Sequence, residues 1–220
     1  MVGLLKVSGN DAKKLLQGQL TCDVNDILPS QSRLGAHCNP QGRIISLFYL
    51  FNYQDDYYLQ MPREMIAIAL KALKKYAIFF KVELTDASDE LSIIGSSCSH
   101  LPTFLENGVA MIYPETSGVF LPHEINLPQL NGVSFNKGCY TGQEIIARMH
   151  YRGKLKNQLH VARCDEGIFI RGNDIYNEKR VAGKIVDYVG NTLLIVTHDA
   201  SQPLFLDETR TQQIQVNHVY

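Results

Sequence analysis

Residues 137–144 read Lys-Gly-Cys-Tyr-Thr-Gly-Gln-Glu and are the most informative stretch of the chain. Its two glycines lie four residues apart and permit a tight backbone turn, while the residues from Ile145 to His150 have helical spacing. Cys139 is therefore expected in a glycine-flanked turn at, or just before, a helix N-terminus, two residues from Lys137. The helix N-terminus and the nearby lysine both stabilise a thiolate, so the sequence predicts that Cys139 is a reactive thiol. A small buried residue that fills a tight turn is the alternative interpretation.

Three further blocks precede this stretch. Residues 9–24 read Gly-Asn-Asp-Ala-Lys-Lys-Leu-Leu-Gln-Gly-Gln-Leu-Thr-Cys-Asp-Val, residues 39–43 read Asn-Pro-Gln-Gly-Arg, and residues 116–122 read Thr-Ser-Gly-Val-Phe-Leu-Pro. With the pattern K-G-C-Y-x-G-Q-E at 137–144, these blocks resemble, in order, those of the YgfZ-type folate-binding proteins. These proteins are relatives of the glycine-cleavage T-protein, an aminomethyltransferase. The resemblance covers roughly residues 3 to 155, and the chain looks shorter than the longer family members.

The resemblance implies an α+β fold similar to that of the T-protein, with antiparallel sheets and helices around a central opening and a small C-terminal β-barrel. Residues 1–155 would form the folate-binding-type core, in which about 41–96 make a β-β-α-β-β subdomain, and 156–220 would form the barrel. Hydrophobic patterning supports this division. Strands are expected at 4–7, 33–38, 43–51, 57–61, 81–84, 91–94, 109–113, 118–121, 159–163, 181–188, 193–197 and 214–219. Helices are expected after an N-cap at Ser8, with Asp11 three residues on and a stop at Gly18, and from Pro62 onward.

The resemblance also implies a function. It is that of a folate-binding accessory protein that supports the assembly or repair of iron–sulfur clusters in client enzymes, including enzymes that modify tRNA, through Cys139. Tetrahydrofolate is the implied cofactor. An aminomethyltransferase of the glycine-cleavage type and an RNA-binding module are the alternatives. The T-protein signature has no cysteine at this position, and its catalytic aspartate has no match here, so an active aminomethyltransferase is not expected. Whether the chain catalyses any reaction stays open.

The candidate site residues follow from the blocks. Cys139 and Lys137 form the candidate catalytic pair, in which Lys137 pairs with an anion or favours the thiolate. The candidate folate-binding residues are Gln17, Gln19, Asp23, Arg43, Gln143, Glu144 and Arg148. A carboxylate such as that of Glu144 can accept hydrogen bonds from pterin N–H groups, or it can pair with Arg148 four residues on. Other candidates also have structural interpretations. Gln17 and Gln19 could cap a helix end, Asp23 could have a structural role and Arg43 could form an ion pair.

The overall charge argues against a protein that binds nucleic acid through bulk positive charge, but one segment of the chain is locally basic. The 220 residues include 21 Lys+Arg and 22 Asp+Glu, a net charge of −1, which does not fit binding of nucleic acid through bulk positive charge. Residues 137–156 nevertheless hold five basic residues and one acid, a local balance of 5 − 1 = +4. This basic patch could attract the glutamate tail of a folate, or tRNA, or it could be a solvated basic face. Its basic residues are Lys137, Arg148, Arg152, Lys154 and Lys156.

The remaining features point to a cytoplasmic protein without a resident metal. No apolar run approaches the roughly 20 residues of a membrane-spanning helix, and the N-terminus lacks the pattern of a secretory signal. The five cysteines are odd in number and form no CxxC, which is typical of reduced thiols. Neither His37 with Cys38 nor Cys98 with His100 has the second half-site of a zinc centre. A stable iron–sulfur cluster is not expected either, although a transient contact through Cys139 stays open.

Overall fold

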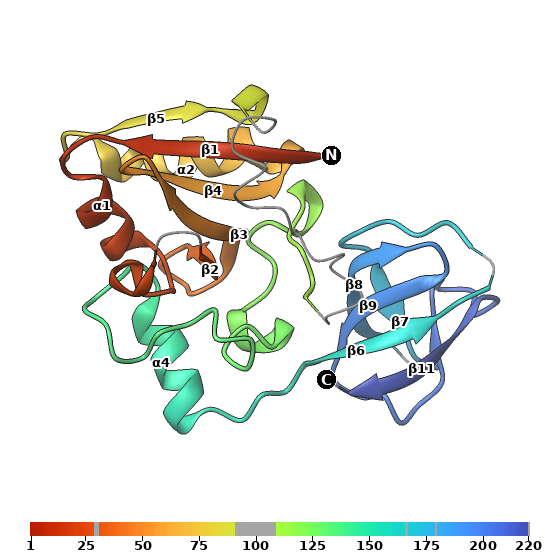
Figure 1. The fold of residues 1–220 in the computed structure, drawn as a ribbon. Helices are drawn as coiled ribbons and strands as arrows, with labels where there is room; N and C mark the ends of the chain where they lie inside the picture. Colours follow the sequence, from red (N-terminus) through yellow and green to blue (C-terminus); the bar gives the residue numbers. More distant parts are fainter. Residues whose placement is uncertain (29–30, 91–108, 166, 179, 220) are drawn as a thin grey trace.

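The structure, a computed structural model, describes residues 1–28, 31–90, 109–165, 167–178 and 180–219. An α+β body is built on a five-stranded sheet, and a closed six-stranded barrel follows it in the chain (Figure 1). All strand pairs in both parts are antiparallel. The predicted α+β class, with antiparallel sheets and a C-terminal barrel, is confirmed. None of the described helices is both long and apolar enough to cross a bilayer.

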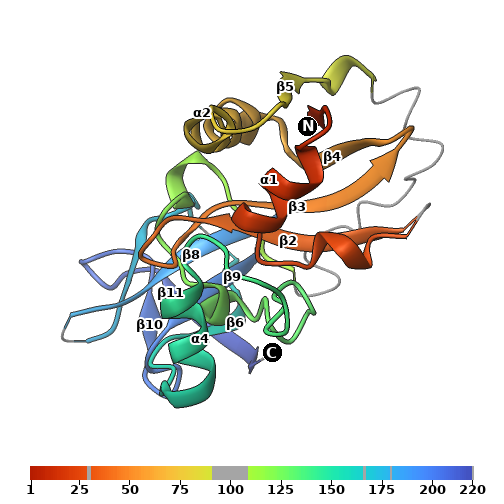
Figure 2. The same cartoon turned by 90° about the vertical axis from the view of Figure 1, so that its left-hand side faces the viewer.

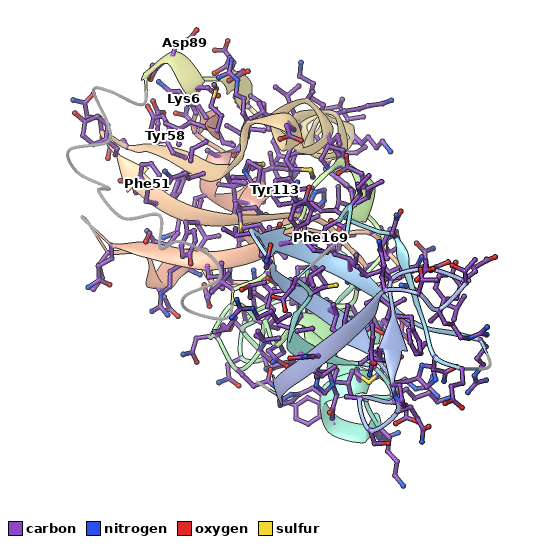
Figure 3. The ribbon with its side chains drawn as sticks, turned by 90° about the vertical axis from the view of Figure 1, so that its right-hand side faces the viewer. Lys6, Phe51, Tyr58, Asp89, Tyr113 and Phe169 are labelled. Carbon is purple, nitrogen blue, oxygen red and sulfur yellow. The ribbon has the colours of Figure 1, made fainter. Side chains whose placement is uncertain are left out.

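The body sheet has the strand order β2-β3-β4-β1-β5. Its strands are β1 (Val2–Ser8), β2 (Ser32–Cys38), β3 (Ile44–Tyr53), β4 (Asp56–Pro62) and β5 (Glu83–Asp86). Helices α1 (Ala12–Gln19) and α2 (Ile66–Ala77) pack against the sheet (Figure 2). Successive side chains of a strand point to opposite faces, so Leu5 and Val7 join the main core while Leu4 joins a smaller cluster. In that smaller cluster Phe51 stacks on Tyr58, with ring centroids 5.5 Å apart (Figure 3).

The start of the first helix differs from its prediction. Ser8 is the last residue of β1 and not an N-cap, because the chain turns at Gly9 with a φ of 105°. Asp11 takes the N-cap position, and its carboxylate accepts a hydrogen bond from the Lys81 N–H at 2.8 Å. Gly18 lies inside α1 and does not end it. The capping pattern was therefore misplaced by three residues, because the partner of Asp11 lies far away in the sequence.

The middle of the chain contains fewer strands than predicted. The order β3, β4, α2, β5 agrees with the predicted β-β-α-β part, with a 3₁₀ turn at Arg63–Met65 before α2, and the strand predicted at 91–94 lies outside the described residues. Residues 109–113 and 118–121 form no strand; they run beside 3₁₀ turns at Pro114–Thr116 and Pro122–Ile125. Val109 to Ile112 are nevertheless buried in the main core.

The barrel closes in the order β10-β11-β6-β9-β8-β7. Its strands are β6 (Gln158–Arg163), β7 (Asp174–Tyr176), β8 (Val181–Val189), β9 (Thr192–Thr197), β10 (Leu204–Phe205) and β11 (Gln213–Val219). Strand β9 is buried on both faces: Leu193 and Ile195 fill the barrel, while Leu194 and Val196 join the core of the body. This is why its sequence is a continuous apolar run. A domain boundary at 155/156 stays a proposal.

An arginine clamp also joins the barrel to the body. The Arg171 guanidinium lies 3.6 Å from the centroid of the Tyr113 ring, and Arg171 pairs with Asp187 of β8 at 2.7 Å. Tyr113 belongs to the body, and both Tyr113 and Phe169 lie where the two parts meet (Figure 3). A stacked, ion-paired guanidinium has a defined orientation. The clamp therefore supports the shared apolar core in fixing the barrel against the body.

A buried histidine in the core of the body should make the folded protein less stable in acid. His37 of β2 is buried, neither ring nitrogen has a hydrogen-bond partner, and burial lowers its pKa from 6.5 to about 4. Between pH 6.5 and 4 the unfolded chain binds this proton and the folded chain does not, so stability falls as the pH falls. In a His37→Phe variant, urea unfolding should show a shallower loss over that window, by on the order of 3 kcal/mol. Equal pH dependence in the two proteins would contradict this assignment.

Candidate functional site

Two of the sequence blocks meet at a pair of glycine turns. Gly142 has a φ of 83°, and a Cβ built on it would lie 2.6 Å from the carbonyl oxygen of Asn39. Gly42 has a φ of 74°, and its Cβ would lie 3.1 Å from the Cβ of Ile145. The turn at 39–43 and the turn that begins helix α4 (Gln143–Arg152) therefore pack directly against each other. Only glycine permits both this conformation and this approach.

The block at 116–122 fastens to the same turn. The Ile44 N–H donates to the Phe120 carbonyl at 2.9 Å, and the Gly118 N–H donates to the Ile44 carbonyl at 2.7 Å. The Arg43 guanidinium donates to the carbonyl of Val119. Arg43 also lines a hollow of about 310 Å³ between the body and the barrel. Arg43 therefore has a backbone partner here, and the ion pair considered from the sequence is not among its described contacts.

The end of α1 holds the loop from the other side. The Thr141 N–H donates to the Gly18 carbonyl at 3.2 Å, and the Thr141 hydroxyl pairs with Oε1 of Gln19 at 3.0 Å. Gln19 is buried. Its side chain therefore anchors residues 137–144 to α1, which is a structural role for a residue predicted to bind folate.

Lys137 is buried beneath the loop. Its Nζ donates to the carbonyls of Leu20 and Cys22, both at 2.8 Å, and lies 5.1 Å from the centroid of the Tyr140 ring. Burial lowers the pKa of Lys137 to about 8, against the opposing effects of Cys22 and Asp23. The predicted pairing of this amine with an anion or with the thiolate of Cys139 is not among its described contacts. The ammonium of Lys137 therefore fastens the loop to the chain just after α1.

Cys139 differs from the other described cysteines in its exposure. Cys22, Cys38 and Cys164 are buried, and Cys139 is exposed. Burial raises the pKa of Cys22 to about 11 and that of Cys38 further still. Cys98 lies outside the described residues. Among the cysteines that the structure describes, Cys139 is therefore the one that a partner can reach.

The thiol lies on an open groove of about 580 Å³ between α1 and the loop. It is lined by Asn10, Asp11, Lys13, Lys14, Gln17, Gly18, Asn25, Gly138 and Cys139. We refer to it as the Cys139 groove. Lys13 and Lys14 are exposed cations that the sequence analysis did not select, because nothing local marks them as neighbours of Cys139. Among the described residues, no cluster of three metal-binding side chains occurs.

The side chains of Gln17 and Asp23 are hydrogen-bonded to each other. The Gln17 Nε2 donates to Asp23 Oδ1 at 3.0 Å, and its Oε1 accepts from the Val24 N–H at 2.8 Å. Although burial acts to raise it, the pKa of Asp23 is lowered by hydrogen bonds from the Asn25 backbone and from Gln17. Asp23 lines a separate hollow of about 260 Å³, so only Gln17 of this pair faces the Cys139 groove.

Glu144 and Arg148 lie elsewhere again. Both are exposed and line a fourth hollow, of about 590 Å³, on the outer face of α4. Gln143 turns its Oε1 toward the Tyr140 N–H at 3.4 Å. The predicted folate ligands therefore do not line one hollow. The sequence positions of the predicted ligands gave no sign that Glu144 and Arg148, on α4, lie on a different surface from Gln17.

The glycine turns provide a test of the loop. In Gly142→Ala the left-handed φ alone should cost about 1–2 kcal/mol, and the contact with the Asn39 carbonyl should add to this. The matched control is Gly138→Ala, since a Cβ at Gly138 meets no atom within 4 Å and its φ is not positive. Urea unfolding followed by circular dichroism should show a loss in the first variant and little change in the second. Equal stability of both variants would mean that the turn is not constrained as described.

Comparison with known proteins identifies the family. No family model matches the chain. The tRNA-modifying protein YgfZ of Colwellia psychrerythraea is 32% identical over 71% of this chain and 68% of that protein. The tRNA-modifying protein YgfZ of Vibrio vulnificus is 30% identical over 72% of this chain and 67% of that protein. The chain thus spans about two thirds of the length of these relatives.

The fold comparison agrees with the resemblance seen in the sequence. The crystal structure of the glycine cleavage system aminomethyltransferase T from Bartonella henselae matches with a TM-score of 0.73, covering 99% of this chain and 82% of that one. Sequence identity is 12%, so this match establishes the T-protein-like fold alone. The two lines of comparison confirm the predicted family and fold, and the chain belongs to the YgfZ family.

Proposed function

We propose that the chain is a cytoplasmic, folate-binding accessory protein that supports iron–sulfur cluster assembly or repair in client enzymes, including enzymes that modify tRNA. The observation that carries this proposal is the placement of Cys139, exposed on a groove while the other described cysteines are buried. The thiolate is both the nucleophile and the metal ligand of cysteine. An exposed thiol in a constrained loop can meet a client, and a buried thiol cannot.

Tetrahydrofolate fits the chemistry of the Cys139 groove. A volume of about 580 Å³ falls within the range of about 300–1,000 Å³ typical of small-molecule sites. Asn10 and Asn25 offer amides to the polar edges of a pterin, and Lys13 and Lys14 offer ammonium groups to the glutamate tail. When bound, tetrahydrofolate carries one-carbon groups. Arg43, Asp23, Glu144 and Arg148 line other hollows and are not needed for this assignment.

A folate titration tests the groove. Tetrahydrofolate at millimolar concentration should raise the thermal midpoint of the protein, because a ligand that binds the native state stabilises it by mass action. The Lys13→Ala/Lys14→Ala double variant should need more ligand for the same shift. Lys154→Ala/Lys156→Ala removes two exposed cations elsewhere and is the matched control. If the control loses as much affinity as the groove variant, the ligand is bound by general charge and not in this groove.

A second experiment separates the thiol from the folate. Cys139→Ala should abolish support of an iron–sulfur client enzyme while the thermal midpoint and its shift with tetrahydrofolate stay the same. Cys164→Ala removes a buried barrel thiol and should keep full support as the control. Client activity is measured in cells that depend on each variant. Full support by Cys139→Ala would show that the thiol has no role.

A contact with tRNA through the basic patch is the second candidate function. Lys137 does not contribute to such a contact, because its ammonium is buried. The other basic residues of the patch, Arg148, Arg152, Lys154 and Lys156, are all exposed. The relatives are named tRNA-modifying proteins, which favours this candidate over the aminomethyltransferase alternative, for which the fold match alone is not sufficient.

A further inference from the structure

The outer face of α4 carries a hollow that is separate from the Cys139 groove. Its volume is about 590 Å³, and it is lined by Glu144, Ala147, Arg148, Tyr151 and Arg152. These positions are three or four residues apart, so one face of the helix supplies the whole lining. The hollow thus combines an aromatic ring and two guanidinium groups with one carboxylate.

The Tyr151 ring is exposed and braced. It is 68% exposed, yet it contacts the His150 ring edge to face at a centroid distance of 4.8 Å and the Phe135 ring edge to face at 6.1 Å. His150 in turn stacks on Phe135 at 3.8 Å. Phe135 comes from the segment before the Cys139 loop, so two segments support one ring. A ring held in this way offers a flat surface with little further ordering on binding.

The ring is surrounded by cations. Arg148 and Arg152 flank Tyr151 in the hollow, and Lys154 and Lys156 follow in the exposed connection to the barrel. Guanidinium groups bind phosphate through paired hydrogen bonds. Glu144 lies at the opposite, N-terminal end of the helix face, where a carboxylate accepts base N–H groups and repels phosphate. Arg152 lies at the C-terminal end of this face, Arg148 in its middle and Glu144 at its N-terminal end.

We propose that this face of α4 binds an unpaired nucleotide of an RNA, with the base stacked on Tyr151 and its phosphates on Arg148 and Arg152. Aromatic side chains bind single-stranded bases in this way without strong sequence preference. The inference rests on the tRNA contact proposed above, and it does not depend on folate binding or on the thiol of Cys139. It adds to that contact the kind of RNA, a single-stranded or flipped-out nucleotide, and the residue that holds it.

A second exposed aromatic residue provides the matched control. Phe79 is 77% exposed just after α2, and the exposed lysines Lys74 and Lys75 lie near it in the sequence. It shares with Tyr151 a protruding ring and basic neighbours. No ring pair is described for Phe79, however, and it lines none of the described hollows. General attraction of RNA to basic surfaces would involve both rings, and stacking in the hollow involves Tyr151 alone.

The test measures fluorescence anisotropy with a labelled ten-nucleotide oligouridine and, in parallel, an unmodified tRNA transcript. Tyr151→Ala should weaken oligouridine binding about 5- to 150-fold, the loss of one stacked base. Tyr151→Phe should keep most of the affinity, because it keeps the ring. Arg148→Ala and Arg152→Ala should each lower the slope of log affinity for oligouridine against log salt by about 0.7. Phe79→Ala and Cys139→Ala should bind as the wild type does.

The possible outcomes distinguish failure of this inference from failure of the tRNA contact on which it rests. If Tyr151→Ala binds oligouridine like the wild type while tRNA still binds with a steep salt dependence, stacking is wrong and the tRNA contact stands. A loss in Phe79→Ala instead would move the site to the end of α2 and overturn the inference. Absence of binding to both RNAs would overturn the inference and the tRNA contact together. The folate titration and the client assay would be unaffected in each case.

Discussion

The buried ammonium of Lys137 is the interaction on which the site depends. An unpaired charge away from water is strongly unfavourable, and here the carbonyls of Leu20 and Cys22 and the face of the Tyr140 ring surround it. The loop cannot lift from the body without separating that ammonium from its partners. Because Lys137 is held inward, Cys139 two residues later can be held outward on the groove.

The second constraint is the contact between two glycine turns. Gly142 and Gly42 lie so close to the neighbouring backbone and side chains that neither position has room for a Cβ without displacement. This contact sets where α4 begins and which of its faces packs against the turn at 39–43. Helix α4 therefore presents one end of the loop to the Cys139 groove and a separate, outer face to solvent. The two proposed binding surfaces are thus products of one packing arrangement.

This division explains the pattern of the candidate residues. Side chains that fasten the loop, Lys137 and Gln19, have their polar atoms engaged with other parts of the body. Side chains at the two surfaces, Cys139 and Lys13 on one and Tyr151 and Arg152 on the other, are exposed. Residues of the same sequence block therefore have different tasks, and proximity in sequence to Cys139 is a poor guide to which residues share its chemistry.

The sequence alone determined the secondary structure of the regular parts and the family, and it singled out the Cys139 loop as the candidate site. Alternation and helical spacing are local properties, and they identified most strands of the sheet and barrel, α2, and the helix after the loop. Tertiary structure decided the partners of polar groups: the burial of Lys137, the N-cap at Asp11, the bond between Gln19 and Thr141, and the separation of Glu144 from the Cys139 groove. A periodic pattern shows which face of an element is buried. The partner of a buried ammonium or amide depends on segments more than a hundred residues away, as Lys137 and Leu20 show, and no local pattern contains that information.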